Sequence, residues 1–144
     1  MKIAIGCDHA GYDLKVKVQE YLNKINIEFN DFGTHSTNSV DYPDFVHPVG
    51  KALNDGLYDL GIVLCGSANG VNMVVNKYSN VRSALCWKKE IAELARQHND
   101  ANILALPARY LSVEEAIEIV NVFLNTNFEG GRHLTRVNKI NKLL

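Results

Sequence analysis

The sequence predicts an α/β fold in which helices cover both faces of a five-stranded parallel sheet. Two observations support this prediction. Apolar runs of strand length alternate five times with amphipathic stretches of helical length, and little sequence remains for loops. The apolar runs are nearly continuous, as expected for parallel strands that helices bury on both sides. The 144 residues are enough for one substantial core, so a single domain over residues 1–144 is expected.

The first two strands and the helix between them follow from the spacing of apolar residues. Residues 2–6 (Lys-Ile-Ala-Ile-Gly) form a short apolar run and predict the first strand. Residues 12–25 predict a helix, because one helical face collects Leu14, Val18, Tyr21, Leu22 and Ile25. Residues 28–32 predict a short second strand that ends at Gly33.

The middle of the chain repeats this alternation. After a polar loop over residues 34–41, Pro43 suits the first turn of a helix that continues to Leu53. The apolar run at 60–64 predicts the third strand. A small-residue loop follows it, and then a short helix at about 70–76.

The last two predicted strands are again separated by a predicted helix. Residues 81–85 predict the fourth strand and residues 102–106 the fifth. Between them, residues 88–98 predict a helix that turns Ile91, Leu94 and Ala95 inward.

The C-terminal third ends in a helix and an additional arm. Ser112 stands three residues before Glu115, the spacing of a capping box, and predicts the start of a helix over 113–124. The segment at about 129–144 is amphipathic and follows the last helix that the sheet needs. We therefore expect this C-terminal arm to pack on a second subunit of a homo-oligomer.

Composition and charge exclude several classes of function. A net charge of −1 argues against a nucleic-acid-binding protein, whose surface is strongly basic. No apolar segment approaches the length that spans a bilayer, and the chain starts with a strand signal rather than a charged and apolar leader. The three cysteines form no Cys-x-x-Cys pair. A cytoplasmic protein that binds neither membrane nor nucleic acid is expected.

The most informative residue is Cys65, at the end of the third predicted strand. It is followed by the small-residue loop 66–70 and then by a helix start. Ligands of open parallel sheets bind at this carboxyl edge, and free N–H groups at a helix start suit an anion. A thiol beside such donors can act as a base or a nucleophile. The alternative is a buried core cysteine, and this segment alone favours neither interpretation.

Other chemistry-bearing residues stand near predicted strand ends. Asp8 and His9 follow the first strand, and His98 and Asn99 end the helix before the fifth strand. We expect these groups to converge with Cys65 at one edge of the sheet. Arg132 and Arg136 lie four residues apart, on one face of a helical arm, where they would clamp a phosphate. The alternative for this pair is ordinary surface charge.

Five familiar sites do not fit the sequence. A phosphatase loop needs arginine six residues after the cysteine, and that residue is Val71. A receiver domain needs an aspartate where Cys65 stands. The dinucleotide fingerprint Gly-x-Gly-x-x-Gly and the elbow Gly-x-Ser-x-Gly are absent. A zinc site from Cys7, Cys65, Cys86 and a histidine lacks the usual paired spacing. An anion loop, a thiol and imidazoles remain, which suit acid–base chemistry on a small phosphorylated substrate.

Five segments together resemble the ribose-5-phosphate isomerase B family, whose wider group includes allose-6-phosphate and galactose-6-phosphate isomerases. The segments lie in order along nearly the whole chain, at residues 6–11, 41–44, 65–67, 96–106 and 128–133. The resemblance implies a Rossmann-like three-layer α/β/α fold and a dimer or tetramer with active sites at the subunit interface. It also implies interconversion of ribose 5-phosphate and ribulose 5-phosphate in the pentose phosphate pathway, with no metal or organic cofactor.

The resemblance also assigns roles to individual residues. It makes Cys65 the catalytic base and His98 the residue that opens the sugar ring. The substrate-binding positions that match are Asp8, His9, Tyr42, Asn99, Arg109, Arg132 and Arg136, with the anion-hole loop Gly66, Ser67, Ala68, Asn69 and Gly70. Ser67 replaces the family's common threonine and keeps its hydroxyl. Ala68 and Asn69 stand where a glycine and an aliphatic residue are frequent.

The residue types suit this chemistry independently. Aldose–ketose isomerisation opens the ring and moves a proton from C2 to C1 through an ene-diolate. Histidine exchanges protons near neutral pH, which suits His98 for ring opening. The thiolate of Cys65 would take the C2 proton, the loop N–H groups would stabilise the oxyanion, and Ser67 would relay a proton between substrate oxygens.

Two alternatives stay open on the sequence. The same chemistry would serve a six-carbon substrate, allose 6-phosphate or galactose 6-phosphate, because pocket length depends on packing that the sequence does not give. A non-catalytic module for sugar phosphates or nucleotides is the other alternative, although a binding module has no chemical need for both Cys65 and His98.

Overall fold

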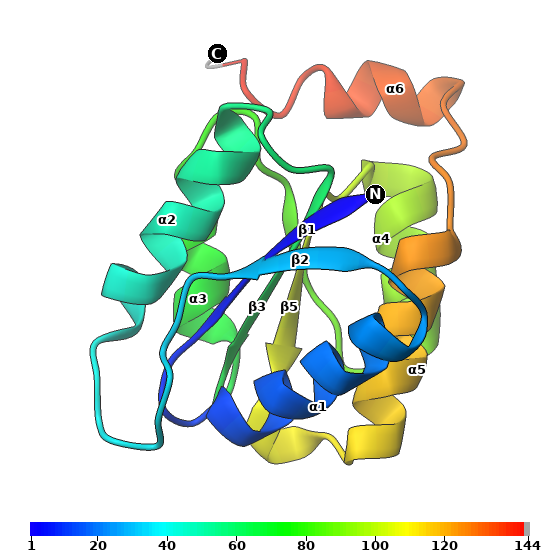
Figure 1. Ribbon diagram of the computed structural model, residues 1–144. Helices are drawn as coiled ribbons and strands as arrows, with labels where there is room; N and C mark the ends of the chain where they lie inside the picture. The colour runs from blue at the N-terminus through cyan, green and yellow to red at the C-terminus, as the bar shows by residue number, and fades with distance from the viewer. Residues whose placement is uncertain (143–144) are drawn as a thin grey trace.

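The computed structural model describes residues 1–142 and confirms the five-stranded parallel sheet (Figure 1). The strands are β1 (Lys2–Cys7), β2 (Glu28–Asp31), β3 (Leu60–Cys65), β4 (Ser83–Leu85) and β5 (Ile103–Pro107). Their spatial order is β2-β1-β3-β5-β4, and every neighbouring pair is parallel. All carboxyl ends therefore lie at one edge of the sheet, the carboxyl edge, and all amino ends lie at the amino edge.

Helices cover both faces of the sheet, as predicted. On one face lie α1 (Tyr12–Lys24), α4 (Lys89–Asn99) and α5 (Val113–Asn125), and on the other lie α2 (Tyr42–Asn54) and α3 (Asn69–Val75). Each layer encloses its own apolar core, one containing Ile62 and Phe123 and the other containing Val49 and Val63. The sheet and its two helical layers confirm the Rossmann-like α/β/α fold.

Element boundaries differ from the predictions by one or two residues. The largest difference is at β4, which begins at Ser83 rather than at residue 81. The N–H group of Val81 donates to the carbonyl of Tyr78 in a turn, 3.0 Å away, so this residue is not free to join the sheet. Pairing with β5 starts at Ser83, opposite Ile103.

The end of the chain contains the predicted helix start and a short helix within the arm. Ser112 Oγ accepts a hydrogen bond from the N–H group of Glu115, and the Glu115 carboxylate accepts one from the N–H group of Ser112, so the capping box is confirmed. Helix α6 (Arg132–Val137) lies across the amino edge of the sheet (Figure 1). Residues 143–144 of the predicted arm lie outside the described residues.

The order of the strands creates a switch point between β1 and β3. From β1 the chain moves outward to β2, and it then crosses back to β3 on the other side of β1. The connections leaving β1 and β3 therefore diverge and leave a crevice at the carboxyl edge. Such crevices are the usual ligand sites of open α/β sheets.

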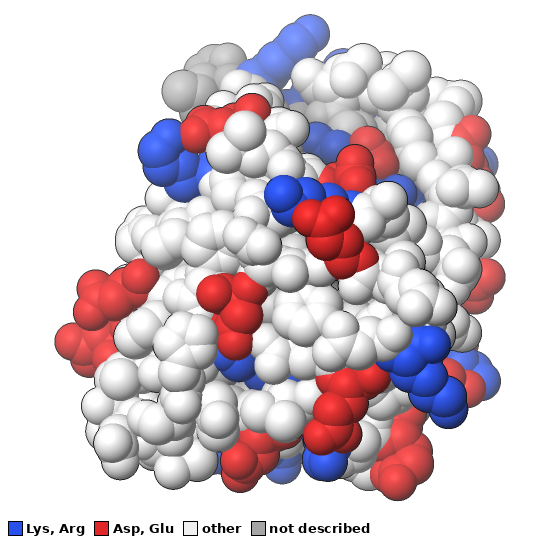
Figure 2. All heavy atoms as spheres, viewed as in Figure 1, with Lys and Arg blue, Asp and Glu red and all other residues white. Residues whose placement is uncertain are grey.

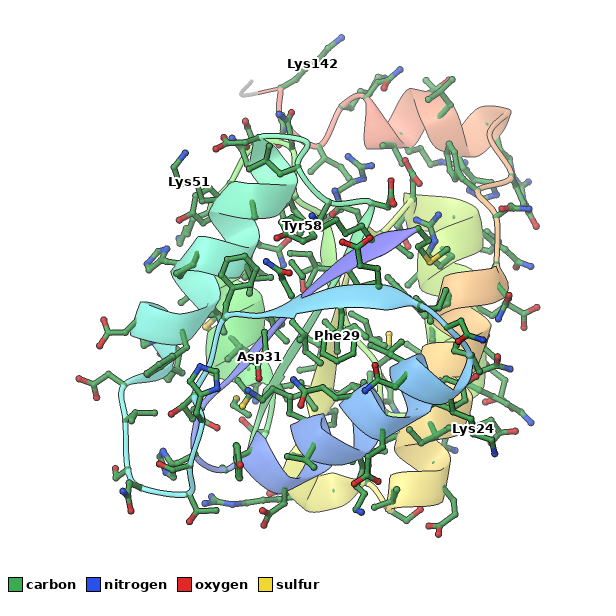
Figure 3. All side chains as sticks on the ribbon, in the orientation of Figure 1. Lys24, Phe29, Asp31, Lys51, Tyr58 and Lys142 are labelled. Carbon is green, nitrogen blue, oxygen red and sulfur yellow. The ribbon has the colours of Figure 1, made fainter. Side chains whose placement is uncertain are left out.

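A buried ion pair fixes the chain beside this edge. The Lys15 side chain is fully buried, and its Nζ atom donates to Asp31 Oδ1 and to the Thr34 carbonyl, both 2.6 Å away. Figure 3 shows Asp31 near the end of β2. Burial would raise the pKa of the Asp31 carboxyl, but hydrogen bonds from Lys15, the Gly33 N–H group and Gln19 outweigh it, so the pKa lies below its usual value.

The surface carries mixed charge. Figure 2 shows the face of the molecule that is turned to the viewer in Figure 1. Acidic and basic side chains are scattered over it among uncharged residues, without a continuous basic patch. In the part of the chain that the structure describes, every helix is too short or too polar to cross a bilayer.

Candidate active site

A concave pocket of about 360 Å³ lies at the carboxyl edge, at the switch point. Its lining comes from the end of β3, from the loops after β1, β3 and β5, and from the first turns of α2 and α3. The lining residues are Asp8, His9, Ala10, Tyr42, Cys65, Gly66, Ser67, Gly70, Arg109 and Tyr110. Eight of these ten were predicted from the sequence. The pocket is of a size that suits a small molecule, and polar groups face it from three loops.

Cys65 is the cysteine that reaches this pocket. Its exposed fraction is 6%, whereas Cys7 and Cys86 are fully buried. Burial raises the pKa of the Cys7 thiol and of the Cys86 thiol to about 12 each, so both stay protonated at neutral pH. Cys7 and Cys65 also belong to the cores on opposite faces of the sheet, so the three thiols do not converge on a zinc ion.

The turn after β1 presents a carboxylate and an imidazole. Asp8 Oδ1 accepts hydrogen bonds from the N–H groups of Ala10 and Gly11 at 2.9 and 3.0 Å, which fixes the side chain against its own turn. His9 Nδ1 accepts a hydrogen bond from the N–H group of Val40 at 3.2 Å. The neutral His9 ring therefore carries its proton on Nε2, the nitrogen that remains free to donate to a ligand.

Arg109 lies directly over the loop that follows Cys65. Its N–H group donates to the Gly66 carbonyl at 3.1 Å, and its Cδ and Nη1 atoms approach so closely that a Cβ at Gly66 would lie 3.2 Å from both. Glycine at position 66 thus allows the guanidinium to lie against the loop backbone. The ion pairs among residues 1–142 do not include Arg109, so its charge is available for an anion in the pocket.

The rest of the loop turns through Ala68 and Ser67. Ala68 is buried and adopts a left-handed backbone, with φ of 62°, a conformation that favours glycine. Ser67 Oγ accepts from the backbone N–H and from the Nδ2 group of Asn69, at 3.4 and 3.3 Å. The Asn69 side chain thus binds Ser67 and lines a neighbouring groove rather than the pocket itself.

Tyr42 closes one side of the pocket against α3. A Cβ at Gly70 would lie 2.6 Å from Tyr42 Cζ, so only glycine allows the phenol ring to pack here. The contact between Tyr42 and Gly70 joins the start of α2 to the start of α3 and narrows the pocket.

The remaining predicted site residues lie at the opposite edge of the sheet. Helix α4 returns the chain from the carboxyl edge to the amino edge, so its last residues, His98 and Asn99, lie at the amino edge. Arg82, just before β4, confirms this placement, because its Nε atom donates to the Asn99 carbonyl at 3.0 Å. Arg132 and Arg136 lie on α6, which packs against α4 at the same edge. The prediction that His98 and Asn99 meet Cys65 at one edge is therefore wrong within one protomer.

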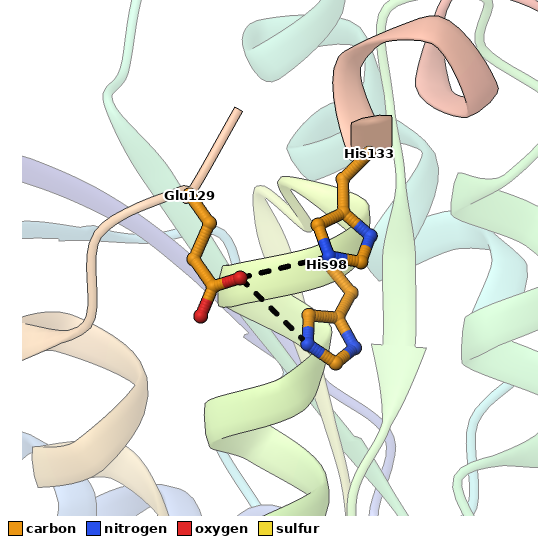
Figure 4. Close-up of side chains that lie close together, drawn as sticks. All are labelled: His98, Glu129 and His133. Carbon is orange, nitrogen blue, oxygen red and sulfur yellow. Dashed lines mark ion pairs between the residues drawn. The ribbon is translucent and has the colours of Figure 1, made fainter. Parts of the chain in front are cut away.

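His98 has two close neighbours there. Its ring stacks on His133, with centroids 4.2 Å apart and an angle of 8° between the planes, and Glu129 Oε2 lies 4.0 Å from His98 Nε2 and 3.6 Å from His133 Nε2 (Figure 4). These three ligand atoms lie within 4.8 Å of one another. Imidazole lone pairs lie in the ring plane, however, and two nearly parallel planes do not direct them at one point, so the arrangement suits stacking rather than chelation.

Ala10 and Tyr110 line the pocket but were not predicted. Ala10 offers no chemical signal in the sequence. Tyr110 follows Arg109 at the end of the fifth strand, so its position at the carboxyl edge was a usable signal.

Comparison with known proteins agrees with this architecture. Residues 3–140 match the family described as Ribose/Galactose Isomerase. Ribose-5-phosphate isomerase B of Escherichia coli (strain K12) is 40% identical over 139 residues, which cover 96% of this chain and 93% of that protein. A crystal structure of the ribose 5-phosphate isomerase of Thermotoga maritima is 47% identical, covers 99% of this chain and 98% of its own, and superposes with a TM-score of 0.96.

A further structure, ribose-5-phosphate isomerase B of Mycoplasma genitalium, contains bound ribulose-5-phosphate. It is 41% identical, covers 96% of this chain and 93% of its own, and superposes with a TM-score of 0.93. Matches of this identity over nearly the full length decide the relationship: the chain belongs to the ribose/galactose isomerase family.

Proposed function

We propose that this protein interconverts ribose 5-phosphate and ribulose 5-phosphate, with Cys65 as the base that moves the proton. The observation that carries the proposal is the Cys65 thiol opening into a pocket that also presents His9 and Arg109. The names of the E. coli and M. genitalium relatives, and the ribulose-5-phosphate bound to the latter, support the same substrate.

We further propose that each active site is completed by a second copy of the chain. Ring opening and proton transfer must act on one substrate molecule, yet His98 and Cys65 lie at opposite edges of the sheet. An apolar groove adjoins the pocket, and its lining includes the largely exposed side chains of Trp87 and Tyr110. A second protomer seated there would cover this surface. It would also bring its own α6, the described part of the C-terminal arm, over the pocket.

The reaction then divides between the two protomers. His98 of one copy donates a proton to the ring oxygen O4 as the C1–O4 bond breaks, and it takes up the proton that the O1 hydroxyl loses, which leaves the open-chain aldehyde. The Cys65 thiolate of the other copy removes the proton from C2, an ene-diolate forms, and the proton returns to C1. Backbone N–H groups of the 66–70 loop stabilise the negative charge on the substrate oxygen, and Ser67 relays a proton between the two oxygens.

Binding of the phosphate group positions the substrate in the pocket. Arg132 and Arg136 are separated by one helical turn on α6, and Arg109 and His9 Nε2 face the pocket. These groups hold the phosphate at one end of the substrate, so that C2 lies against the thiol. Asp8 and Asn99 bind sugar hydroxyls, and Tyr42 limits the length of the chain that fits.

The cellular compartment and the oligomeric organisation that we propose rest on the same residues. The three cysteines are free and one of them must stay reduced for activity, which fits the cytoplasm. The whole of residues 1–144 acts as one isomerase domain in a homo-oligomer, and no residue of the proposed mechanism requires a cofactor.

Turnover of ribose 5-phosphate to ribulose 5-phosphate in the presence of a chelator tests the proposal. We expect activity in the wild type and in the matched control Cys86→Ala, which removes a thiol outside the pocket. Cys65→Ala should stay folded and lose turnover. Full activity in Cys65→Ala would remove Cys65 from the mechanism. No activity in folded wild type would reject ribose 5-phosphate, and six-carbon sugar phosphates would then be assayed.

A further inference from the structure

His98 stacks on His133, and Glu129 lies beside both rings. Of these three residues, only His98 has a role in the proposed mechanism. His133 is the buried member, with a side chain 11% exposed, whereas the His98 side chain is 38% exposed. The exposed His98 ring thus packs against the buried His133 ring. Figure 4 shows both rings with their Nε2 atoms on the side of the Glu129 carboxylate.

The backbone between the two histidines holds this arrangement in place. The N–H group of Glu129 donates to the Gln97 carbonyl at 3.1 Å, which ties the arm to the last turn of α4, next to His98. Gly130 and Gly131 then adopt φ of 67° and 54°, values that residues other than glycine rarely take, and the chain reverses into α6. This turn places His133 over His98.

The surroundings of His133 favour its uncharged form. Burial, and then the positive charges of a protonated His98, Arg132 and Arg136, lower the pKa of His133, and Glu129 only partly offsets them. A neutral His133 ring stacks 4.2 Å from the His98 ring without charge repulsion. The exposed ring of His98 is the one that can reach a substrate.

We propose that His133 and Glu129 are positioning residues for His98: the His133 ring sets the plane of the His98 imidazole, and Glu129, whose carboxylate lies 3.6 Å from His133 Nε2 and whose N–H group binds the last turn of α4, holds the His133 ring in place. This inference rests on the proposed function, because it assumes that His98 opens the sugar ring. A fixed ring plane matters there, since proton transfer to a ring oxygen needs an aligned donor, and misplacement of a reacting group by about 1 Å can cost about 100-fold in rate.

Two assays separate the ring-opening step from the proton transfer at carbon. Ribulose 5-phosphate carries its phosphate on O5, so it cannot close a five-membered ring and is open-chain. Exchange of its C1 proton with solvent D₂O, followed by ¹H NMR, therefore reports the Cys65 step alone. Turnover of ribose 5-phosphate, which is mainly cyclic, requires both steps.

His133→Ala tests the stacking. We expect it to lower turnover of ribose 5-phosphate by about 10- to 100-fold while C1 exchange of ribulose 5-phosphate changes little. His133→Phe, which keeps an aromatic face, should restore most of the turnover. The exposed neighbour on α6 serves as the control, and Thr135→Ala should resemble wild type. The upfield ring-current shift of the His98 Cε1 proton should disappear in His133→Ala, a readout that needs no activity.

Glu129→Gln tests the carboxylate. The amide keeps the size of the side chain but removes the charge that faces His133 Nε2. Turnover of ribose 5-phosphate should therefore fall in Glu129→Gln while C1 exchange of ribulose 5-phosphate changes little, and the ring-current shift of the His98 Cε1 proton should decrease. The matched control Glu114→Gln removes an exposed carboxylate on α5 and should leave both rates unchanged.

The outcomes also separate this inference from the proposed function. Equal losses of turnover and of C1 exchange in folded His133→Ala, no rescue by His133→Phe, or wild-type turnover in Glu129→Gln would overturn the positioning roles while wild-type activity stands. Wild type that neither turns over ribose 5-phosphate nor exchanges the C1 proton of ribulose 5-phosphate would overturn the proposed function instead. The NMR shift of His98 would still show whether His133 sets its ring plane.

Discussion

Mixing two inactive variants tests whether Cys65 and His98 act across a subunit interface. Cys65 lies at the carboxyl edge and His98 at the amino edge, and strands of five or six residues separate such edges by about 17–20 Å. One protomer therefore cannot bring both groups to one small substrate. Cys65→Ala lacks the base and His98→Asn lacks the ring-opening group, so each homo-oligomer alone should be inactive.

The expected recovery follows from counting sites. If equal amounts of the two variants assort at random into symmetric dimers, half of the dimers are mixed. Each mixed dimer has one site with both substitutions and one site with neither. About one quarter of all sites are then wild type, so mixing should restore about one quarter of wild-type activity. A tetramer built from two such dimers gives the same fraction.

Co-expression, or unfolding and refolding of the mixture, provides the subunit exchange, and turnover of ribose 5-phosphate is the assay. Cys65→Ala with Arg109→Ala is the matched control. Both residues line the pocket of one protomer, so every site in the mixed dimer keeps one substitution and no recovery is expected. Activity of the first mixture that stays at the level of the parents, with mixed dimers verified by mass spectrometry, would refute the two-protomer site.

Three further predictions concern the single chain. Asp31→Asn leaves the buried Lys15 ammonium without its carboxylate and should lower the free energy of unfolding in urea by about 3–5 kcal/mol. Because the pKa of Asp31 is lowered by folding, its contribution is complete above about pH 4, the unfolded-state value. The gap between wild type and Asp31→Asn should therefore narrow as the pH falls below this value; a gap that stays constant to pH 2 would contradict the assignment. Iodoacetamide at pH 8 should alkylate Cys65 and spare Cys7 and Cys86, whose pKa values are about 12, as peptide mass spectrometry would show; modification of all three at similar rates would argue against the burial described here. Gly70→Ala gains about 1 kcal/mol of helix propensity but places a Cβ 2.6 Å from the Tyr42 ring. It should raise KM for the sugar phosphate while the midpoint of thermal unfolding changes little, and an unchanged KM would show that Tyr42 does not shape the pocket.

The pocket half of the site was largely predictable from the sequence. Cys65 and Asp8 follow apolar runs, and the carboxyl ends of parallel strands share one edge, so their proximity follows from strand assignment alone. The capping box of α5 was predictable for a similar reason, because it depends on residues three positions apart. Local spacing contains all the information that these features need.

The placement of His98 was mispredicted, although a topological rule was available. A helix that connects two parallel strands returns the chain to the amino edge, so the end of such a helix lies opposite the end of the preceding strand. His98 lies in the last turn of α4 and was assigned to the carboxyl edge because of its nearness in sequence to the fifth strand. The residues just before β5 lie at the amino edge of the sheet, and His98 lies at this edge too.

The sequence by itself determined the alternation of strands and helices, the parallel sheet and the position of Cys65 at a strand end, since each depends on periodicity within a few residues. It also contained the motifs that the family shares. The tertiary structure alone decided that Lys15 is buried against Asp31, that Arg109 lies on Gly66 and that His133 stacks on His98. These contacts join residues from separate elements, and side chains meet across elements only after the packing of the layers has fixed their distance and direction.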